Sequence, residues 1–207
     1  TIDKIATKRV LEQAGVPTAP YEVLSRGMSE TALPLPVVVK PPRDGSSVGI
    51  TKVSDATEWP AALAAARAID AQGEVLVETY IPGREWTVGV LADEALPVVE
   101  IQAPQGWYGF QEKYTQGVTR YVFPQSEADR PLVASCQVLA LVAFKAVGCR
   151  GVSRVDFRVT PDGQPFVLEI NTVPGFTSTS LLPKAAAQAG ISFSALCARL
   201  LESAACG

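Results

Sequence analysis

The apolar positions along the chain switch repeatedly between a helical period and a period of two. Apolar side chains at helical spacing predict helices over residues 3–15, 55–68, 129–147, 181–189 and 194–203. Short runs rich in Val, Ile and Leu predict strands over residues 21–24, 36–40, 50–53, 74–80, 85–91, 97–102, 152–159 and 164–170. Helices interleaved with short strands indicate the α+β fold class.

Two interruptions of this pattern divide the chain. The sequence Ile81-Pro82-Gly83 breaks a strand, and we place a boundary there between two lobes, residues 1–82 and 83–207. Residues 103–117 form a loop that is long for a compact domain. Loops of that length are usually lids or binding loops, so we predict a lid.

Composition excludes several classes of protein. The chain has 207 residues, of which 47% are hydrophobic and 19% charged, as in a folded protein with a buried core. The formal net charge is −3 and no basic run is present, so we expect no nucleic-acid partner. The apolar run 138–144 is far shorter than the roughly 18 residues of a membrane span, and no signal peptide opens the chain. We therefore expect a cytoplasmic protein with no membrane contact.

The chain contains no histidine. This absence excludes histidine as a general base, Ser-His and Cys-His nucleophile pairs within the chain, and zinc sites that need imidazole. A metal bound by this chain must therefore rest on oxygen ligands.

The segment 153–171 predicts a hairpin that carries two carboxylates. Both halves alternate with period two around the turn signal Asp162-Gly163. A two-residue or four-residue loop would set Phe157 opposite Leu168 and Asp156 opposite Glu169. A three-residue loop would mix apolar and polar faces, so we expect one of the other two.

The predicted register has a chemical consequence. Carboxylates that face each other across a ladder repel by up to about 1 kcal/mol. A hard cation such as Mg²⁺ would offset that repulsion, and Asn171, opposite Arg154, would add an amide oxygen. The alternative is an exposed polar face on which Arg154 and Arg158 neutralise the acids.

Residues 44–49, Asp-Gly-Ser-Ser-Val-Gly, suit a loop laid over phosphates. They offer backbone N–H groups, two hydroxyls and two glycines. The P-loop spacing is absent, since Lys40 precedes the loop at a strand end. A plain turn is the alternative interpretation.

Several segments together resemble one family in order and in spacing. They are residues 38–41, 45–50, 78–81, 83–88, 112–114, 153–156 and 169–181. The chain is similar over almost its whole length to the ATP-grasp ligases, and specifically to the D-alanine–D-alanine ligases. The most specific segment joins Glu169-Ile170-Asn171 to a Pro-Gly-x-Thr-Ser loop at residues 174–178.

The resemblance implies the ATP-grasp fold, in which two α+β lobes hold ATP between their sheets. The implied ATP ligands are Lys4, Lys40, Ser46, Ser47, Glu78, Thr79, Tyr80, Ile81, Glu85 and Lys113. Among these, lysines would meet the phosphates, Glu78 the adenine edge and Glu85 the ribose. The implied ligands of Mg²⁺, with Mn²⁺ as an alternative, are Asp156, Glu169 and Asn171.

The resemblance also implies an amino-acid site and a reaction. The implied catalytic groups are Arg154 and the Gly175 backbone for the oxyanion, with Ser46 on the phosphate loop and Tyr114 beside the amino acid. Ser180 and Leu181 would hold the carboxylate of the second D-alanine. ATP would phosphorylate one D-alanine, and a second would displace the phosphate to give D-alanyl-D-alanine for peptidoglycan precursors.

The sequence departs from this family in one respect. Members carry an N-terminal α/β domain that supplies an acidic residue and a histidine for the first D-alanine. This chain shows neither that domain nor any histidine. We expect that domain to act in cis or in trans. A homodimer is a further possible assembly. Two alternatives remain: an ATP-grasp carboxylate–amine ligase for another pair of substrates, and an ATP-binding module inactive without that domain.

Overall fold

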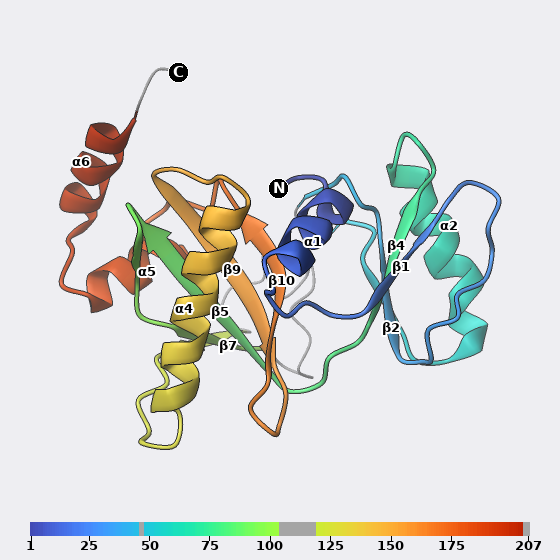
Figure 1. The fold of residues 1–207 in the computed structure, drawn as a ribbon, viewed down its shortest axis with the longest axis horizontal. Coiled ribbons are helices and arrows are strands. Elements are labelled where there is room, and N and C mark those ends of the chain that lie inside the picture. Colours follow the sequence, from blue (N-terminus) through green and yellow to red (C-terminus); the bar gives the residue numbers. More distant parts are fainter. Residues whose placement is uncertain (46–47, 104–118, 205–207) are drawn as a thin grey trace.

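A computed structural model describes residues 1–45, 48–103 and 119–204. Two antiparallel sheets dominate the fold and lie at opposite sides of helix α1 (Lys4–Gln13) (Figure 1). The predicted helices and strands are confirmed to within two residues at their ends, except that the helix predicted from residue 55 begins as an α-helix at Trp59, after a short 3-10 helix. No helix in the described ranges is long and apolar enough to cross a membrane.

The smaller sheet has four strands in the order β1-β4-β2-β3. Its strands are β1 (Tyr21–Leu24), β2 (Val37–Lys40), β3 (Thr51–Val53) and β4 (Val75–Thr79). The 3-10 helix η1 (Ala56–Glu58) and helix α2 (Trp59–Ile69) follow β3, and α2 covers one face of the sheet (Figure 1). Fully buried valines of β2 and β4 pack with leucine and alanines of α2.

The larger sheet has six strands, in the order β10-β9-β5-β7-β8 with β6 paired to β5. They are β5 (Arg84–Leu91), β6 (Glu94–Ala95), β7 (Val99–Gln102), β8 (Arg120–Val122), β9 (Val152–Val159) and β10 (Pro165–Asn171). Helix α4 (Arg130–Ala146) packs over one face, while α5 (Leu181–Gln188) and α6 (Phe193–Ser203) close one end. Strands β6 and β8, with two and three residues, were not predicted.

Helix α1 lies between the sheets, and its contacts follow from its sequence. Asp3 caps it as predicted, accepting a hydrogen bond from the Ala6 N–H at 2.9 Å. Leu11 and Val16 join the apolar core beneath β5 and β9. Thus α1 packs against the larger sheet although it precedes the smaller one. The division of the chain at residue 82 stays a prediction.

The hairpin of β9 and β10 corrects one prediction and confirms another. Val159 pairs with Pro165, and the Thr160 N–H donates to Gln164 O at 3.0 Å, which leaves a three-residue loop, 161–163. The predicted loop length was therefore wrong. A β-bulge between Val167 and Glu169 then adds Leu168 as an extra residue. Phe157 therefore faces Val167 rather than Leu168. The predicted pairing of Glu169 with Asp156 is confirmed because the bulge compensates for the loop.

Gly83 lies between β4 of the smaller sheet and β5 of the larger sheet, in a backbone conformation that few other residues adopt. Its φ is +124°, and a Cβ there would lie 2.0 Å from the carbonyl oxygen of Val159. We expect Gly83→Ala to lower the free energy of unfolding by about 2–4 kcal/mol, from strain and overlap together. Urea denaturation measures this loss.

Gly148→Ala is the matched control for Gly83→Ala. Gly148 also has a positive φ, +69°, but nothing lies within 4 Å of the position that a Cβ would take there. We expect a cost of about 1 kcal/mol at Gly148, from backbone strain alone. Equal losses in the two variants would contradict the overlap at Gly83.

Candidate nucleotide and metal site

The three predicted metal ligands come together on one face of the larger sheet. Asp156 on β9 pairs in register with Glu169 on β10 and with Thr87 on β5. Residues directly opposite each other share a face, so these side chains converge. Asn171 pairs with Arg154, two residues further along the same hairpin.

The carboxylate of Asp156 is the centre of this cluster. It accepts hydrogen bonds from Thr87 Oγ1 at 2.6 Å, from Arg154 Nε at 2.8 Å and from Asn171 Nδ2 at 3.0 Å. The same Asn171 amide reaches Glu169 Oε1 at 3.4 Å. Arg154 therefore neutralises Asp156, as the alternative interpretation held. Arg158 instead pairs with Glu85, 3.2 Å away.

The residue types of this cluster fit a hard divalent cation, which would take the amide oxygen of Asn171 in place of the nitrogen that faces the carboxylates here. Two carboxylates and an amide are the protein ligands that Mg²⁺ takes alongside water and phosphate oxygens. Within the described ranges, no group of three or more Asp, Glu or Cys side chains is placed to hold a metal. The pair Asp156 and Glu169 would thus leave coordination positions for ligands from outside the chain.

Glu78 forms a buried charge cluster at the end of β4. Its carboxylate is 3% exposed, lies 2.8 Å from the Lys8 ammonium through Oε1, and pairs with Lys40 through Oε2. The Lys8 contact lacks the alignment of a hydrogen bond, and no described group donates one to Oε1. Burial opposes ionisation, but the charges of Lys40 and Lys8 hold the pKa of Glu78 below its ordinary value.

Lys8 was not predicted as a site residue, although the sequence contains a signal for it. Lys8 stands three residues after Ile5 and three before Leu11, on the buried stripe of α1. A charged residue at a core position of an amphipathic helix requires a buried partner. That pattern was available without a structure.

Lys4 contacts the loop that follows β2 and lies near enough to Glu169 for that charge to affect its pKa. Its ammonium donates to the backbone oxygen of Asp44, and its N–H donates to Pro42 O at 2.9 Å. Burial lowers the pKa of Lys4, with attraction to Glu169 opposing and repulsion from Lys40 reinforcing that shift. The charges of Glu169 on the larger sheet and of Lys40 on the smaller sheet therefore both act on the Lys4 ammonium.

Arg158 fixes the segment that connects the two sheets and was not predicted to do so. Its guanidinium is buried and donates to the backbone oxygens of Ile81 at 3.0 Å and Gly83 at 2.9 Å. It also donates to Tyr80 Oη and Glu85 Oε2, each at 3.2 Å. One side chain thus orients three of the predicted ATP contacts, those at Tyr80, Ile81 and Glu85.

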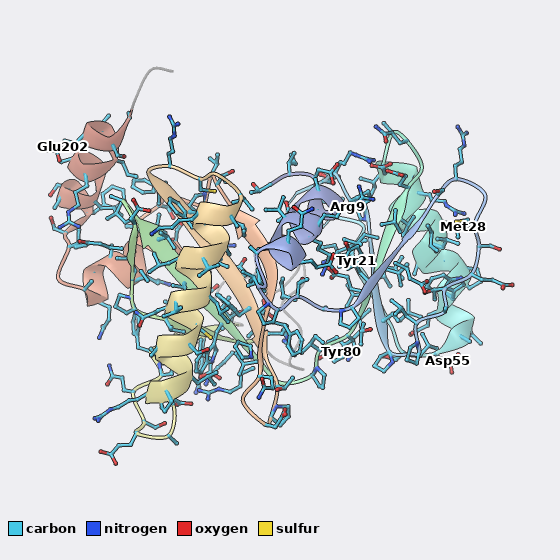
Figure 2. All side chains as sticks on the ribbon, viewed as in Figure 1. Arg9, Tyr21, Met28, Asp55, Tyr80 and Glu202 are labelled. Atoms are coloured by element: carbon cyan, nitrogen blue, oxygen red, sulfur yellow. The ribbon has the colours of Figure 1, made fainter. Side chains whose placement is uncertain are left out.

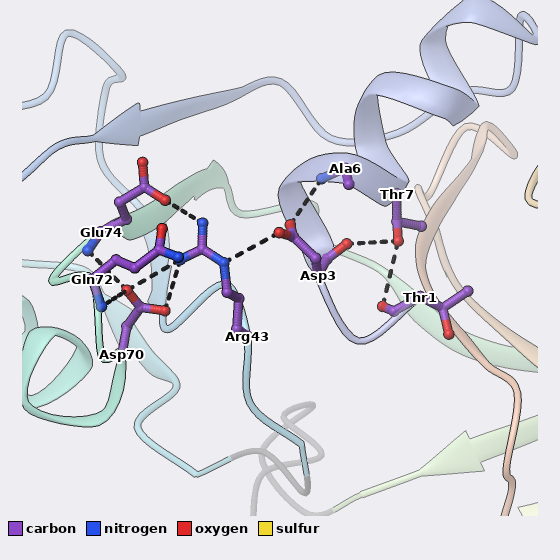
Figure 3. Close-up of polar contacts among 8 residues, drawn as sticks. All are labelled: Thr1, Asp3, Ala6, Thr7, Arg43, Asp70, Gln72 and Glu74. Atoms are coloured by element: carbon purple, nitrogen blue, oxygen red, sulfur yellow. Dashed lines mark hydrogen bonds and ion pairs between the residues drawn. The ribbon is translucent and has the colours of Figure 1, made fainter.

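Arg43 anchors the loop stem, the segment between β2 and residues 44–49 (Figure 3). Its Nε donates to Asp3 at 3.2 Å, Nη1 donates to Asp70 at 3.0 Å, and Nη2 pairs with Glu74. Asp70 also accepts the N–H groups of Gln72 and Glu74, both at 3.0 Å. The cap of α1, the loop stem and the turn before β4 are therefore held as one unit.

The predicted substrate residues lie together at the start of α5. A Cβ on Gly175 would lie 3.1 Å from Ser180 Oγ, and Ser180 Oγ accepts the Thr177 N–H at 3.0 Å. Leu181, the first residue of α5, is buried in the apolar cluster that α5 shares with β5 and β7.

Among the predicted ATP contacts, Thr79 ends β4 and pairs with Val37. Four predicted residues, Ser46, Ser47, Lys113 and Tyr114, and the predicted lid 103–117 except for residue 103, lie outside the described residues.

Comparison with known proteins decides the family. Residues 10–202 match the family described as the C-terminus of D-ala D-ala ligase. The chain belongs to this family. It is 44% identical to the D-alanine–D-alanine ligase of Bordetella petrii over all of this chain and 65% of that protein. It is 46% identical to that of Citrifermentans bemidjiense over 98% of this chain and 66% of that protein. The chain thus spans slightly less than two thirds of these relatives.

Solved structures of this family share the fold. The D-alanine–D-alanine ligase of Bacillus anthracis complexed with ATP superposes with a TM-score of 0.81 at 30% identity, over 98% of this chain and 65% of that one. A second structure of that enzyme gives 0.84 at 33% identity, over 98% and 66%. The predicted α+β fold, two antiparallel sheets in the ATP-grasp arrangement, is confirmed.

Proposed function

We propose that this chain binds ATP between its two sheets and supplies the catalytic part of a D-alanine–D-alanine ligase. The observation that carries the proposal is the cluster of Asp156, Glu169 and Asn171 on one face of the larger sheet. The Lys4 ammonium, which donates to Asp44 O, is attracted by Glu169. The ATP complex of the Bacillus anthracis ligase, which shares this fold, supports it.

The ATP ligands in this proposal come from both lobes. Lys4 and Lys40 would hold phosphates, with Ser46, Ser47 and Lys113 from the two loops. Glu78 would accept the adenine amino group, the backbone of 79–81 would meet the ring, and Glu85 would bind the ribose hydroxyls. Asp156, Glu169 and Asn171 would hold Mg²⁺ or Mn²⁺, which would neutralise phosphate charge when bound.

The reaction would proceed in two steps. The carboxylate of one D-alanine attacks the γ-phosphorus, the bond to ADP breaks, and an acyl phosphate forms. The amine of a second D-alanine then attacks the acyl carbon; the C–N bond forms, phosphate leaves and the amine loses a proton. Arg154 and the Gly175 N–H would stabilise the oxyanion, and Ser180, Leu181 and Tyr114 would position the second D-alanine.

The charged side chains of this chain would supply what phosphoryl transfer needs without histidine. Phosphoryl transfer depends mainly on positioning and on stabilising charge, which lysines, an arginine and a divalent cation supply. D-alanyl-D-alanine would serve peptidoglycan synthesis in the cytoplasm. The first D-alanine would be held by an N-terminal domain, in cis or in trans, and pairing into a homodimer would involve that domain.

Phosphate release tests the proposal. The chain is incubated with ATP, Mg²⁺ and D-alanine, and both phosphate and D-alanyl-D-alanine are measured. We expect release to require D-alanine and to yield the dipeptide. Release that depends on another amino acid would identify a different carboxylate–amine ligase. ATP binding without release for any amino acid would indicate a binding module that needs its partner domain.

A further inference from the structure

Lys8 is a buried charge that the proposed reaction does not use. Its side chain is 2% exposed, and it comes from α1, whereas its partner Glu78 lies on β4. The Lys8 ammonium donates to Thr18 Oγ1 at 2.6 Å and to the Ala19 backbone oxygen at 2.9 Å. The centroid of the Tyr21 ring lies 4.9 Å from Lys8 Nζ. The position of the Lys8 ammonium is therefore fixed from several sides.

The segment that holds Lys8 is itself attached to the larger sheet. Thr18 Oγ1 donates to the Val167 backbone oxygen at 2.9 Å, and the Val167 N–H donates to Pro17 O at 2.8 Å. Thr18 and Val167 form a parallel bridge beside β10. Lys8 is thus anchored to the sheet that carries Glu169, two residues beyond Val167.

Lys40 differs from Lys8 in this respect. Among residues 1–45, 48–103 and 119–204, the Lys40 ammonium makes one ion pair, with Glu78 Oε2, and no further hydrogen bond. Its side chain is 8% exposed, against 2% for Lys8. Lys40 can therefore turn toward a phosphate, while Lys8 is bound to Thr18 and Ala19.

We propose that Lys8 is a positioning residue that keeps Glu78 charged and oriented as the acceptor of the adenine amino group when Lys40 turns to the phosphates. This inference rests on the proposed function. Without Lys8, Glu78 would lose both counter-charges once Lys40 moved, and a buried carboxylate without a counter-charge is costly. Lys8 would therefore contribute to selection for adenine without touching the nucleotide.

A pair of nucleotides isolates this role. Purine riboside 5′-triphosphate lacks the 6-amino group of ATP but keeps the ring, ribose and phosphates. Hydrogen bonds to charged acceptors contribute about 1.5–3 kcal/mol, or roughly 10- to 150-fold in affinity. We expect the unmodified protein to bind ATP at least about tenfold more tightly than the analogue, by calorimetry with Mg²⁺.

Lys8→Met is expected to reduce the preference for ATP over the analogue to below about threefold, mainly by weakening the binding of ATP. Arg9→Met, an exposed charge removed from the same helix (Figure 2), is expected to leave the preference unchanged. If Lys8→Met is recovered unfolded, Thr18→Val, which removes one anchor of Lys8, should lower the preference at least about twofold.

The outcomes separate this inference from the function on which it rests. An unchanged preference in folded Lys8→Met, with both nucleotides weakened alike, would overturn the inference and leave ATP binding intact. Failure of the unmodified protein to bind ATP would overturn the proposed function and the inference together. Loss of the preference in Lys8→Met alone supports both.

Discussion

Glu169→Gln is expected to lower phosphate release from ATP, Mg²⁺ and D-alanine at least 100-fold. Glu169 faces Asp156 across the β9–β10 ladder, and the two carboxylates with Asn171 form the oxygen set that suits Mg²⁺. The amide keeps the shape of Glu169 but removes one of two negative charges. A loss of that size corresponds to about 2.7 kcal/mol of transition-state stabilisation.

Stability distinguishes this effect from damage to the fold. Two facing carboxylates repel, so Glu169→Gln should leave the melting temperature unchanged or slightly raised. Asp162→Asn is the matched control, because Asp162 is an exposed carboxylate in the turn of the same hairpin. We expect the control to keep full activity. Activity of Glu169→Gln within threefold of the unmodified protein would contradict a metal role for Glu169.

Glu78→Gln is expected to lower the free energy of unfolding by about 3–5 kcal/mol at pH 7. Glu78 lies between two lysines that are themselves buried, Lys8 and Lys40. Removing the one negative charge leaves two buried ammonium groups without compensation, and breaking a buried ion pair costs about this much. Urea denaturation measures the loss. Glu22→Gln, on neighbouring β1, is the control on a more exposed carboxylate.

The pH dependence of this loss follows from the lowered pKa of Glu78. A carboxylate whose pKa is lowered by folding stabilises the protein fully above its unfolded value, 4.5, and loses that contribution as the pH falls through the folded pKa. The gap in stability between the unmodified protein and Glu78→Gln should therefore narrow below about pH 4.5. A gap that stayed constant from pH 7 to pH 3 would contradict the buried ion pairs.

The local elements were predictable because each has its own signals. Asp3 before an apolar stripe and Gly15 after it define α1, and these signals act within a few residues. The short strands β6 and β8 lack any such signal. Side chains that act over long sequence distances were also not predicted: Arg158 reaches Ile81 O, 77 positions earlier in the chain. Nothing in the local pattern around Arg158 indicates that contact.

The hairpin shows a different limit of sequence reasoning. The pairing of Asp156 with Glu169 was predicted correctly, although the loop has three residues and Leu168 forms a bulge. A bulge adds one residue to one strand, and a three-residue loop shifts the register by one, so the two departures cancel at the functional pair. Alternation alone reveals neither. Lys8, in contrast, was predictable from its place between Ile5 and Leu11.

Calorimetric titration of ATP, with and without Mg²⁺, tests the central claim most directly. The claim is that Lys4, Lys40 and Glu78 bind ATP while Asp156 and Glu169 hold the cation that accompanies its phosphates. We predict that Mg²⁺ tightens ATP binding at least about tenfold, and that Glu169→Gln abolishes this gain while still binding ATP. Absence of ATP binding, or an affinity that is the same with and without Mg²⁺, would contradict the claim.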